Sequence, residues 1–358
     1  MSNQSYAYAM GRIRAVERKM IGKAQLDRMI DAKSADDAVR ILREFGYGRA
    51  GGAADAAAAY GDGGSGGSGS IGSGSIGSIG GGSGYERLLE EENDKLTGFM
   101  AEISPEPLLL DVFLRKYDYH NIKVLLKSEF SGRGGDAPLS AAGIVPPRKL
   151  ADIVRDRSLS ELPRAMAAGI AGAVAAYQKA LDPQAIDIAL DRAAYSQMLE
   201  EARELGSPFL TGLVEIYVDL ANIGAFARIR AMNKSLDFLR GALLDGGAVD
   251  KGVFARHFAD STDNFIAALQ FTPYGPMCEA GLKAWQAGGS LTAFERLADD
   301  FVMEYARAAK LKPFGPDLLV AHLVARQAEL KNVRIVLVGK TNGIPGDTIR
   351  ERLRETYA

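Results

Sequence analysis

Apolar and polar positions follow each other along this chain with the period of an α-helix. In the first segment, apolar residues recur every three or four positions and charged residues fill the gaps. The apolar set is Ile13, Val16, Met20, Leu26, Met29 and Ile30, and the charged set is Arg12, Arg14, Arg18, Lys19 and Asp27. Such spacing is typical of helices with one face in a core. The best strand candidate is the apolar run 333–338, which stands alone, so we predict an all-α fold.

Residues 61–84 differ in kind from the rest, because 20 of these 24 residues are Gly or Ser. A segment of this composition buries too little apolar surface to offset the entropy lost on ordering. We therefore predict a flexible linker. Natural low complexity and an engineered replacement both remain open as its origin.

Outside the linker, a short motif occurs three times: an acid, two residues, an asparagine and an apolar residue. The asparagines are 101 and 110 residues apart, and the pairs are Asp118 and Asn121, Asp219 and Asn222, and Glu329 and Asn332. An acid and an amide three residues apart lie on one face of a helix. They are either ligands for three equivalent partner contacts or fasteners that hold a backbone loop by hydrogen bonds. We favour the second interpretation.

The sequence around each motif also repeats. Upstream, a serine is placed to cap a short helix, with a capping box predicted at the second copy: Ser34, Ser158 and Ser261. A longer amphipathic helix follows, starting near Tyr85, Ile186 and Thr292. Downstream, a glycine begins a loop that leads into another helix, and these loops form a candidate partner-facing rim: Gly143, Gly247 and Gly343.

This order of elements predicts three homologous helical lobes with approximate threefold symmetry. Their predicted bounds are 1–157, which contains the linker 61–84, then 158–260 and 261–358.

Charge and cysteine content narrow the function. Lys plus Arg is 43 and Asp plus Glu is 45, and this balance argues against nucleic acid as the main partner. The single cysteine, Cys278, excludes an intrachain disulfide and favours a reducing cytoplasm. The longest uncharged apolar stretch, 165–178, is shorter than the roughly 20 residues that span a bilayer, so we predict no transmembrane segment.

Motifs that carry chemistry are weak in this sequence. Gly339-Lys340-Thr341 resembles the end of a phosphate-binding loop, but Arg334 occupies the position where that loop needs glycine. The three histidines, His120, His257 and His322, form no recognised metal pattern, and we interpret them as surface or half-buried residues. Glu90 to Glu92 are expected on a solvated face. We predict no catalytic residue, no cofactor and no metal.

Three stretches carry a family resemblance: 6–14, 113–123 and 325–345. They resemble the C subunit of prokaryotic V-type and A-type ATPases, whose eukaryotic relative is the d subunit of the vacuolar proton pump. The resemblance covers the chain apart from the linker, and the C-terminal stretch is its most specific part.

The resemblance implies a funnel-shaped body of three helical lobes around a central cavity. It also implies a non-catalytic coupling subunit, peripheral on the cytoplasmic face of a prokaryotic membrane, which passes rotation between the central-stalk subunits and the rotor-ring proteolipids. The resemblance does not distinguish an ATP-driven pump from an ATP synthase, or a complex that moves protons from one that moves sodium ions. The alternative is a free-standing helical scaffold outside any rotary ATPase.

A chain without catalytic side chains should tolerate loss of its most reactive ones. Alanine at His120, His257 and Cys278 is expected to leave the activity of the assembled complex largely intact. Complete loss of activity in a variant that still folds would refute the non-catalytic interpretation.

Overall fold

The structure is a computed structural model that describes residues 4–48, 83–132, 139–312 and 315–357. Within these ranges every regular element is a helix and no strand occurs, which confirms the all-α prediction. The predicted linker 61–84 lies outside them, except for its last two residues, which begin a helix.

The chain divides into two compact units. Unit 1 combines the two ends of the sequence, Met1–Pro105 and Ala306–Ala358, whereas unit 2 is the continuous stretch Glu106–Tyr305. The division into three lobes at residues 157 and 260, and the funnel shape, stay predictions.

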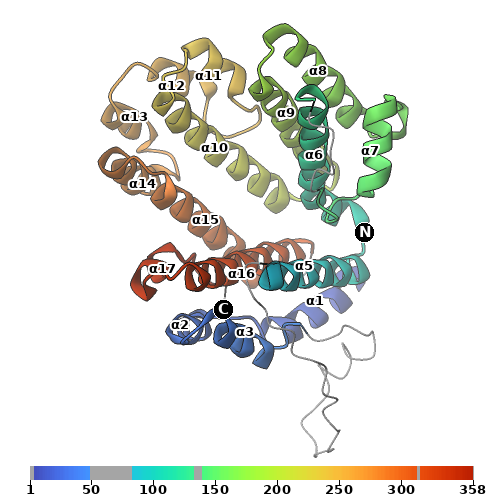
Figure 1. The fold of residues 1–358 in the computed structure, drawn as a ribbon, viewed down its shortest axis with the longest axis vertical. Coiled ribbons are helices and arrows are strands. Elements are labelled where there is room, and N and C mark those ends of the chain that lie inside the picture. The colour runs from blue at the N-terminus through green and yellow to red at the C-terminus, as the bar shows by residue number, and fades with distance from the viewer. Residues whose placement is uncertain (1–3, 49–82, 133–138, 313–314, 358) are drawn as a thin grey trace, which may run out of the picture. The chain divides into compact units, whose positions relative to one another are not determined.

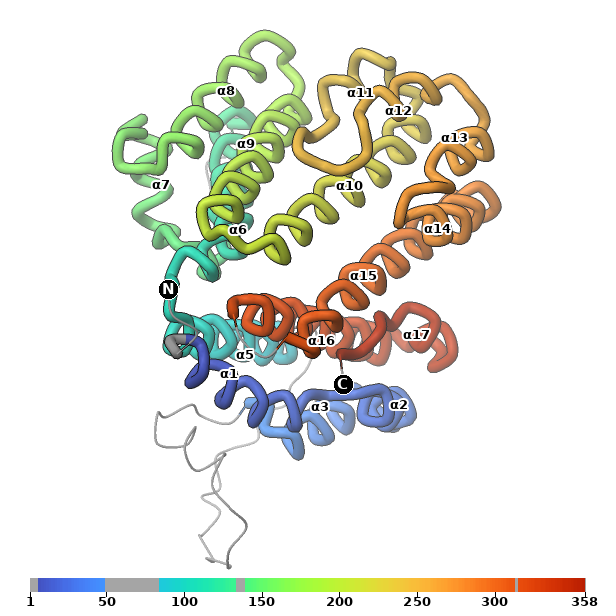
Figure 2. The backbone as a smooth tube through the Cα atoms, turned by 180° about the vertical axis from the view of Figure 1, so that it is seen from behind, coloured from blue at the N-terminus to red at the C-terminus, as the bar shows by residue number. Residues whose placement is uncertain are grey.

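Unit 1 is built around its longest helix, α16 (Asp317–Thr341). This helix packs against α5 (Ser83–Ile103), and both views of the backbone show the two side by side (Figures 1 and 2). The other helices in contact with α16 are α1 (Gln4–Glu17), α2 (Lys23–Asp31), α3 (Ala35–Glu44), the 3₁₀ turn η2 (Ala308–Leu311) and α17 (Gly346–Arg352). The first predicted apolar stripe divides between α1 and α2, and one of its residues, Met20, lies in the break at residues 18–22.

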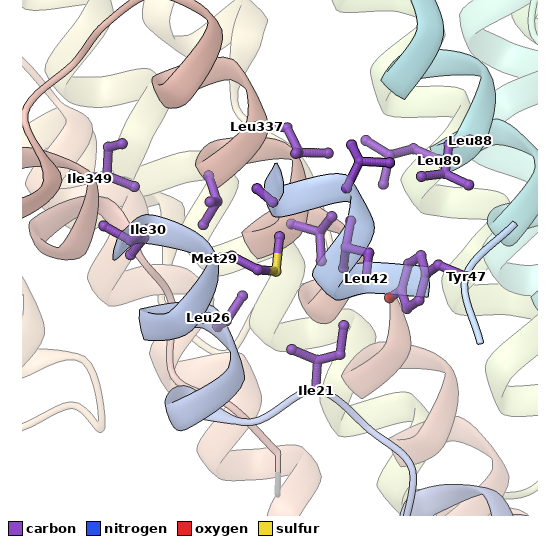
Figure 3. Packing of buried hydrophobic residues seen from close by; sticks show 14 residues of the cluster. Ile21, Leu26, Met29, Ile30, Leu42, Tyr47, Leu88, Leu89, Leu337 and Ile349 are labelled. Carbon is purple, nitrogen blue, oxygen red and sulfur yellow. The ribbon is translucent and has the colours of Figure 1, made fainter. Parts of the chain in front are cut away.

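The hydrophobic core of unit 1 joins residues from both ends of the sequence. Figure 3 shows Leu26, Met29 and Leu42 from α2 and α3 packed with Leu337 from α16 and Leu88 from α5. The run 333–338, the best strand candidate, lies inside α16 and supplies three fully buried residues to this core: Val333, Val336 and Leu337. Helical periodicity explains this, because the three side chains lie on one helix face.

Unit 2 begins with a bundle in which α6 packs against the helices that follow it. Its elements are α6 (Pro107–Phe130), α7 (Pro147–Asp156), η1 (Leu159–Glu161), α8 (Arg164–Ala180) and α9 (Pro183–Glu204). One buried cluster, which includes Ile122, Leu150, Met166 and Leu190, holds these elements together.

The remaining elements of unit 2 are α10 (Pro208–Ala231), α11 (Leu236–Ala242), α12 (Lys251–Arg256), α13 (Thr262–Leu269), α14 (Gly275–Gly288) and α15 (Thr292–Arg307). The last two residues of α15 lie in unit 1. Aromatic rings fill this core. Phe226 stacks on Phe265 with ring centroids 3.9 Å apart and also meets Phe254 and Phe258.

Two of the three predicted serine caps are present. Ser34 and Ser261 accept hydrogen bonds from the backbone N–H groups three residues on, at the starts of α3 and α13. Ser158 makes no such bond, so the predicted capping box there is wrong. Its ψ of 52° is not the extended conformation that a cap needs, and only a single 3₁₀ turn follows it.

Helix α10 is long and apolar enough, by length and composition alone, to cross a membrane. Its most apolar window has a mean hydropathy of 1.4, and 67% of that window is buried inside the protein. Core helices pass the same test, so this is weak evidence for a membrane span. The absence of a transmembrane segment stays a prediction.

The aromatic core around Phe226 gives a direct test of packing. Phe226→Ala removes a buried ring and should lower the free energy of unfolding by about 3–5 kcal/mol, measured by chemical denaturation. The control is Phe271→Ala, since Phe271 is 97% exposed and its loss should change stability by less than about 0.5 kcal/mol. Equal effects at the two positions would contradict this description of the core.

Candidate functional site: the helix–loop clamps

The three repeated asparagines make the same pair of hydrogen bonds. Each side-chain amide donates to a backbone carbonyl of a later loop, and each side-chain oxygen accepts the N–H of that same residue. The two distances are 2.9 and 2.8 Å for Asn121 with Ser140, 3.1 and 2.8 Å for Asn222 with Leu244, and 3.0 and 2.8 Å for Asn332 with Arg354. We call each such pair a clamp.

Asparagine suits this role because its planar amide carries a donor and an acceptor, as a peptide group does. The three side chains are almost completely buried, so each clamp satisfies the donor and the acceptor of an amide that would otherwise be desolvated without a partner. The geometry is that of the fastener interpretation, although a partner role for the six motif residues is not tested by it.

The acids of the first two motifs extend their clamps. Asp118 accepts the backbone N–H groups of Ile144 and Val145 at 3.3 and 3.1 Å. Asp219 accepts those of Ala248 and Val249, both at 3.0 Å. Burial raises the pKa of Asp118, and the two backbone hydrogen bonds oppose that shift. Both carboxylates therefore hold the loop four and five residues beyond the clamp residue.

Glycine is needed where these loops pass the acids. A Cβ atom at Gly143 or Gly247 would lie well under 3.0 Å from the Oδ1 atom of Asp118 or Asp219, a distance that real Cβ atoms essentially never show. Any larger residue would push the loop off its carboxylate. The two glycines are thus part of the clamps, and the partner-facing rim stays a prediction.

Gly343 occupies a different place from the other two loop glycines. It follows the end of α16 with φ of 65°, in open space, and Ile344 N–H bonds back to the carbonyl of Gly339. Asn233 has the same role after α10, with φ of 52°. A helix that ends in this way needs a left-handed residue, so this glycine belongs to the helix end rather than to the clamped loop.

Two tyrosines complete the second and third motifs, and the repeat pattern did not reveal them. Tyr274 donates its hydroxyl to Oδ2 of Asp219 at 2.8 Å, and Tyr47 donates to Oε1 of Glu329 at 2.6 Å. Burial raises the pKa of both phenols far above the ordinary value, so both stay protonated donors. A signal existed, because each tyrosine lies 13 residues after a capping serine (47 − 34 and 274 − 261).

Glu329 differs from the other two acids because it binds side chains instead of loop N–H groups. Besides Tyr47 it accepts a hydrogen bond from the guanidinium of Arg326, one turn earlier on α16. Arg326 also lies 4.0 Å from Glu92 on α5, whose Oε1 accepts the N–H of Gly48 at 3.0 Å. Glu92 is buried, so the prediction of a solvated face fails at this residue, while Glu90 and Glu91 are exposed.

A second buried polar group lies in unit 2, on α6 and α9. Arg115 donates to Glu201 at 2.9 Å, and Gln197 donates to the same Oε1 atom at 2.8 Å. Tyr119 donates to Gln197 at 2.8 Å. Both units thus contain an arginine paired with a buried carboxylate, with a tyrosine in the same hydrogen-bond network.

The histidines do not come together in the described part of the chain. His120 is exposed, and His257 is half-buried with its Nδ1 2.8 Å from Asp260. His322 is only 1% exposed and lies edge-on to Phe99, so its interpretation as a surface or half-buried residue is wrong. Cys278 is buried, and burial raises the pKa of its thiol to about 12. Among the residues searched, no group of three His, Cys, Asp or Glu side chains could hold a metal ion.

Lys340, the lysine of the motif that resembles a phosphate-binding loop, binds backbone carbonyl groups. Its ammonium group donates to the carbonyl of Ile30 at 2.9 Å and also to that of Ala32, at the end of α2. Cations suit a helix C-terminus because the last carbonyls there lack partners within the helix. Arg230, eight residues after its asparagine as Lys340 is after Asn332, donates to the carbonyl of Asp260 beyond α12 at 2.7 Å.

Comparison with known proteins gives one family. Residues 79–352 match a family model described as ATP synthase (C/AC39) subunit. The C subunit of the V-type sodium ATPase of Enterococcus hirae is 27% identical over 273 residues, which is 76% of this chain and 83% of the relative. The C subunit of the A-type ATP synthase of Methanocaldococcus jannaschii is 22% identical over 369 residues, 97% of this chain and 86% of the relative. That of Haloferax volcanii is 25% identical over 260 residues, covering 68% and 73%.

The glycine requirement predicts a strong effect of one methyl group. Gly247→Ala should lower the free energy of unfolding by about 1–3 kcal/mol, because the new Cβ displaces Asp219 from the N–H groups of Ala248 and Val249, the second of which is buried. Gly241→Ala is the matched control, since a Cβ there meets nothing within 4 Å inside α11 and should stabilise by up to about 1 kcal/mol. Thermal and chemical unfolding of both variants would check this, and a harmless Gly247→Ala would refute it.

The buried side chain of His322 should make the folded protein less stable in acid. Its pKa falls from 6.5 to about 3, first because of burial and then because of Arg326. Below about pH 6.5 the unfolded chain therefore binds more protons than the folded chain. The free energy of unfolding decreases as the pH is lowered from 6.5 to 3. The loss from this group should reach about 2 kcal/mol at pH 5.

The variant His322→Met should remove this part of the pH dependence between pH 7 and 5, measured by denaturation at each pH. His120→Met is the control, because it removes an exposed histidine and keeps His322, so the loss of stability in acid should persist. An unchanged slope in His322→Met would contradict the assignment.

Proposed function

The chain belongs to the ATP synthase (C/AC39) subunit family, and from that membership we propose that it couples the central stalk of a rotary ATPase to the membrane rotor ring. The observation that carries this proposal is the family match over residues 79–352. The relatives are named as C subunits of a V-type sodium ATPase and of A-type ATP synthases, and they support the assignment to such a complex.

The proposed role is mechanical rather than catalytic. A protein that passes torque must deform little under load, which calls for a close-packed interior and loops fixed to their helices. The clamps meet this demand, because Asn121, Asn222 and Asn332 each fix a loop residue 19 to 22 positions later in the sequence. The two arginine–carboxylate pairs add further rigid links within each unit.

The proposed partners are the central-stalk subunits on one side and the rotor-ring proteolipids on the other. The proposed location is the cytoplasmic face of the membrane, where the chain is held as a peripheral part of the complex. Direction of operation and the ion moved are left open, since the named relatives include a sodium ATPase and ATP synthases.

The test is recovery of partners from native membranes. A tagged chain is purified after gentle solubilisation, and the chains that accompany it are identified by mass spectrometry. Stalk subunits and the ring proteolipid are expected in the tagged sample and should be missing from an untagged control. Recovery of the chain alone, or with unrelated partners, would refute the coupling role in favour of a free-standing scaffold.

A further inference from the structure

We infer that unit 1 opens and closes as one cooperative body, held shut by a latch of Tyr47, Glu329, Arg326 and Glu92, while unit 2 stays folded. This inference concerns the conformational behaviour of the chain and does not depend on the proposed coupling role. Its basis is that the core of unit 1 is assembled from two distant parts of the sequence, whereas unit 2 is continuous.

One cluster of buried residues lies in unit 1 and another lies in the α6–α9 bundle of unit 2. The cluster in unit 1 draws residues from 21–47, 88–89 and 333–349, and it shares no residue with the α6–α9 cluster in unit 2. Leu89 and Val333 belong to one core although they are 244 positions apart in the sequence (333 − 89). The chain passes between the units only after Pro105 and after Tyr305. Loss of packing in one core therefore need not propagate into the other.

Opening of unit 1 would expose both of its halves at once. Helix α16 packs against α2, α3 and α17, so its departure removes the apolar partner of Leu26, Met29 and Leu42 in the same event (Figure 3). Short amphipathic helices such as α2 and α3 are not stable alone in water. The N-terminal and C-terminal parts of unit 1 should therefore exchange their amide hydrogens with a common opening equilibrium.

The latch lies where the two halves meet. Tyr47 comes from the N-terminal part and donates to Glu329 on α16, whose side chain is 2% exposed. Arg326 binds the same carboxylate and approaches Glu92 on α5, which in turn holds the N–H of Gly48. Removal of one partner leaves a buried charge less well satisfied, which costs more than loss of a surface pair.

Two ion pairs that also link the halves are more exposed and individually weak. Arg334 pairs with Glu86 at 2.8 Å, and Arg350 pairs with Asp27 at 3.2 Å, each with side chains roughly a third to a half exposed. These two ion pairs contribute little to the stability of the closed unit, whereas the latch contributes most.

The test is amide hydrogen exchange of the full chain, followed by mass spectrometry, on a matched pair of variants. Tyr47→Phe and Tyr274→Phe each delete one buried hydroxyl that donates to a motif carboxylate, the first in unit 1 and the second in unit 2. Tyr47→Phe should speed exchange in α2, α3, α5, α16 and α17 together by roughly ten- to a hundred-fold. It should leave α6 to α9 unchanged, and Tyr274→Phe should leave unit 1 unchanged.

Three results would overturn the inference. Faster exchange confined to the neighbours of Tyr47 would show local fraying, and a uniform increase in both units would show one cooperative molecule. No change at all would show that the hydroxyl does not hold the unit closed. A second pair keeps the test independent of the latch: Lys340→Met should open unit 1, and Arg230→Met should not.

Discussion

A polar group buried in a helical core must find its hydrogen bonds there, and this constraint organises the whole molecule. Asn121, Asn222 and Asn332 each meet it by pairing with both backbone groups of one loop residue. The side chain and the loop satisfy each other, so neither can leave the core without stranding the other. Helices α6, α10 and α16 are thereby each fixed to the chain that follows them.

The neighbouring residues follow from that pairing. Once a loop is held against its helix, the acid one turn earlier faces the N–H groups of the next loop residues, as Asp118 and Asp219 do. The loop then passes so close to the carboxylate that only glycine fits, at Gly143 and Gly247. At the third motif the longer Glu329 takes a tyrosine hydroxyl and a guanidinium from its surroundings instead. Buried charge thus replaces loop N–H groups at the place where the two ends of the sequence meet.

For a component of a rotary machine, this construction has a clear mechanical sense. Torque is lost wherever a loop can move independently of its helix, and the clamps remove that freedom with side chains that are themselves buried. The cost is strict dependence on a few polar residues and on glycine at defined positions. The discontinuous core of unit 1 adds one place where the chain can yield without loss of unit 2.

The sequence by itself determined the helices, the caps at Ser34 and Ser261, and the repeated acid–asparagine motif, because each depends on spacing within a few residues. Only the tertiary structure decided the rest. It showed that Gly343 ends a helix, that His322 and Glu92 are buried, and that Tyr47 and Tyr274 complete two motifs. It also showed that α16 packs against the N-terminal helices as well as against its neighbours in the sequence. Local hydrogen bonding and amphipathicity are written in short windows of sequence, whereas the partner of a buried group depends on which distant apolar faces pack together.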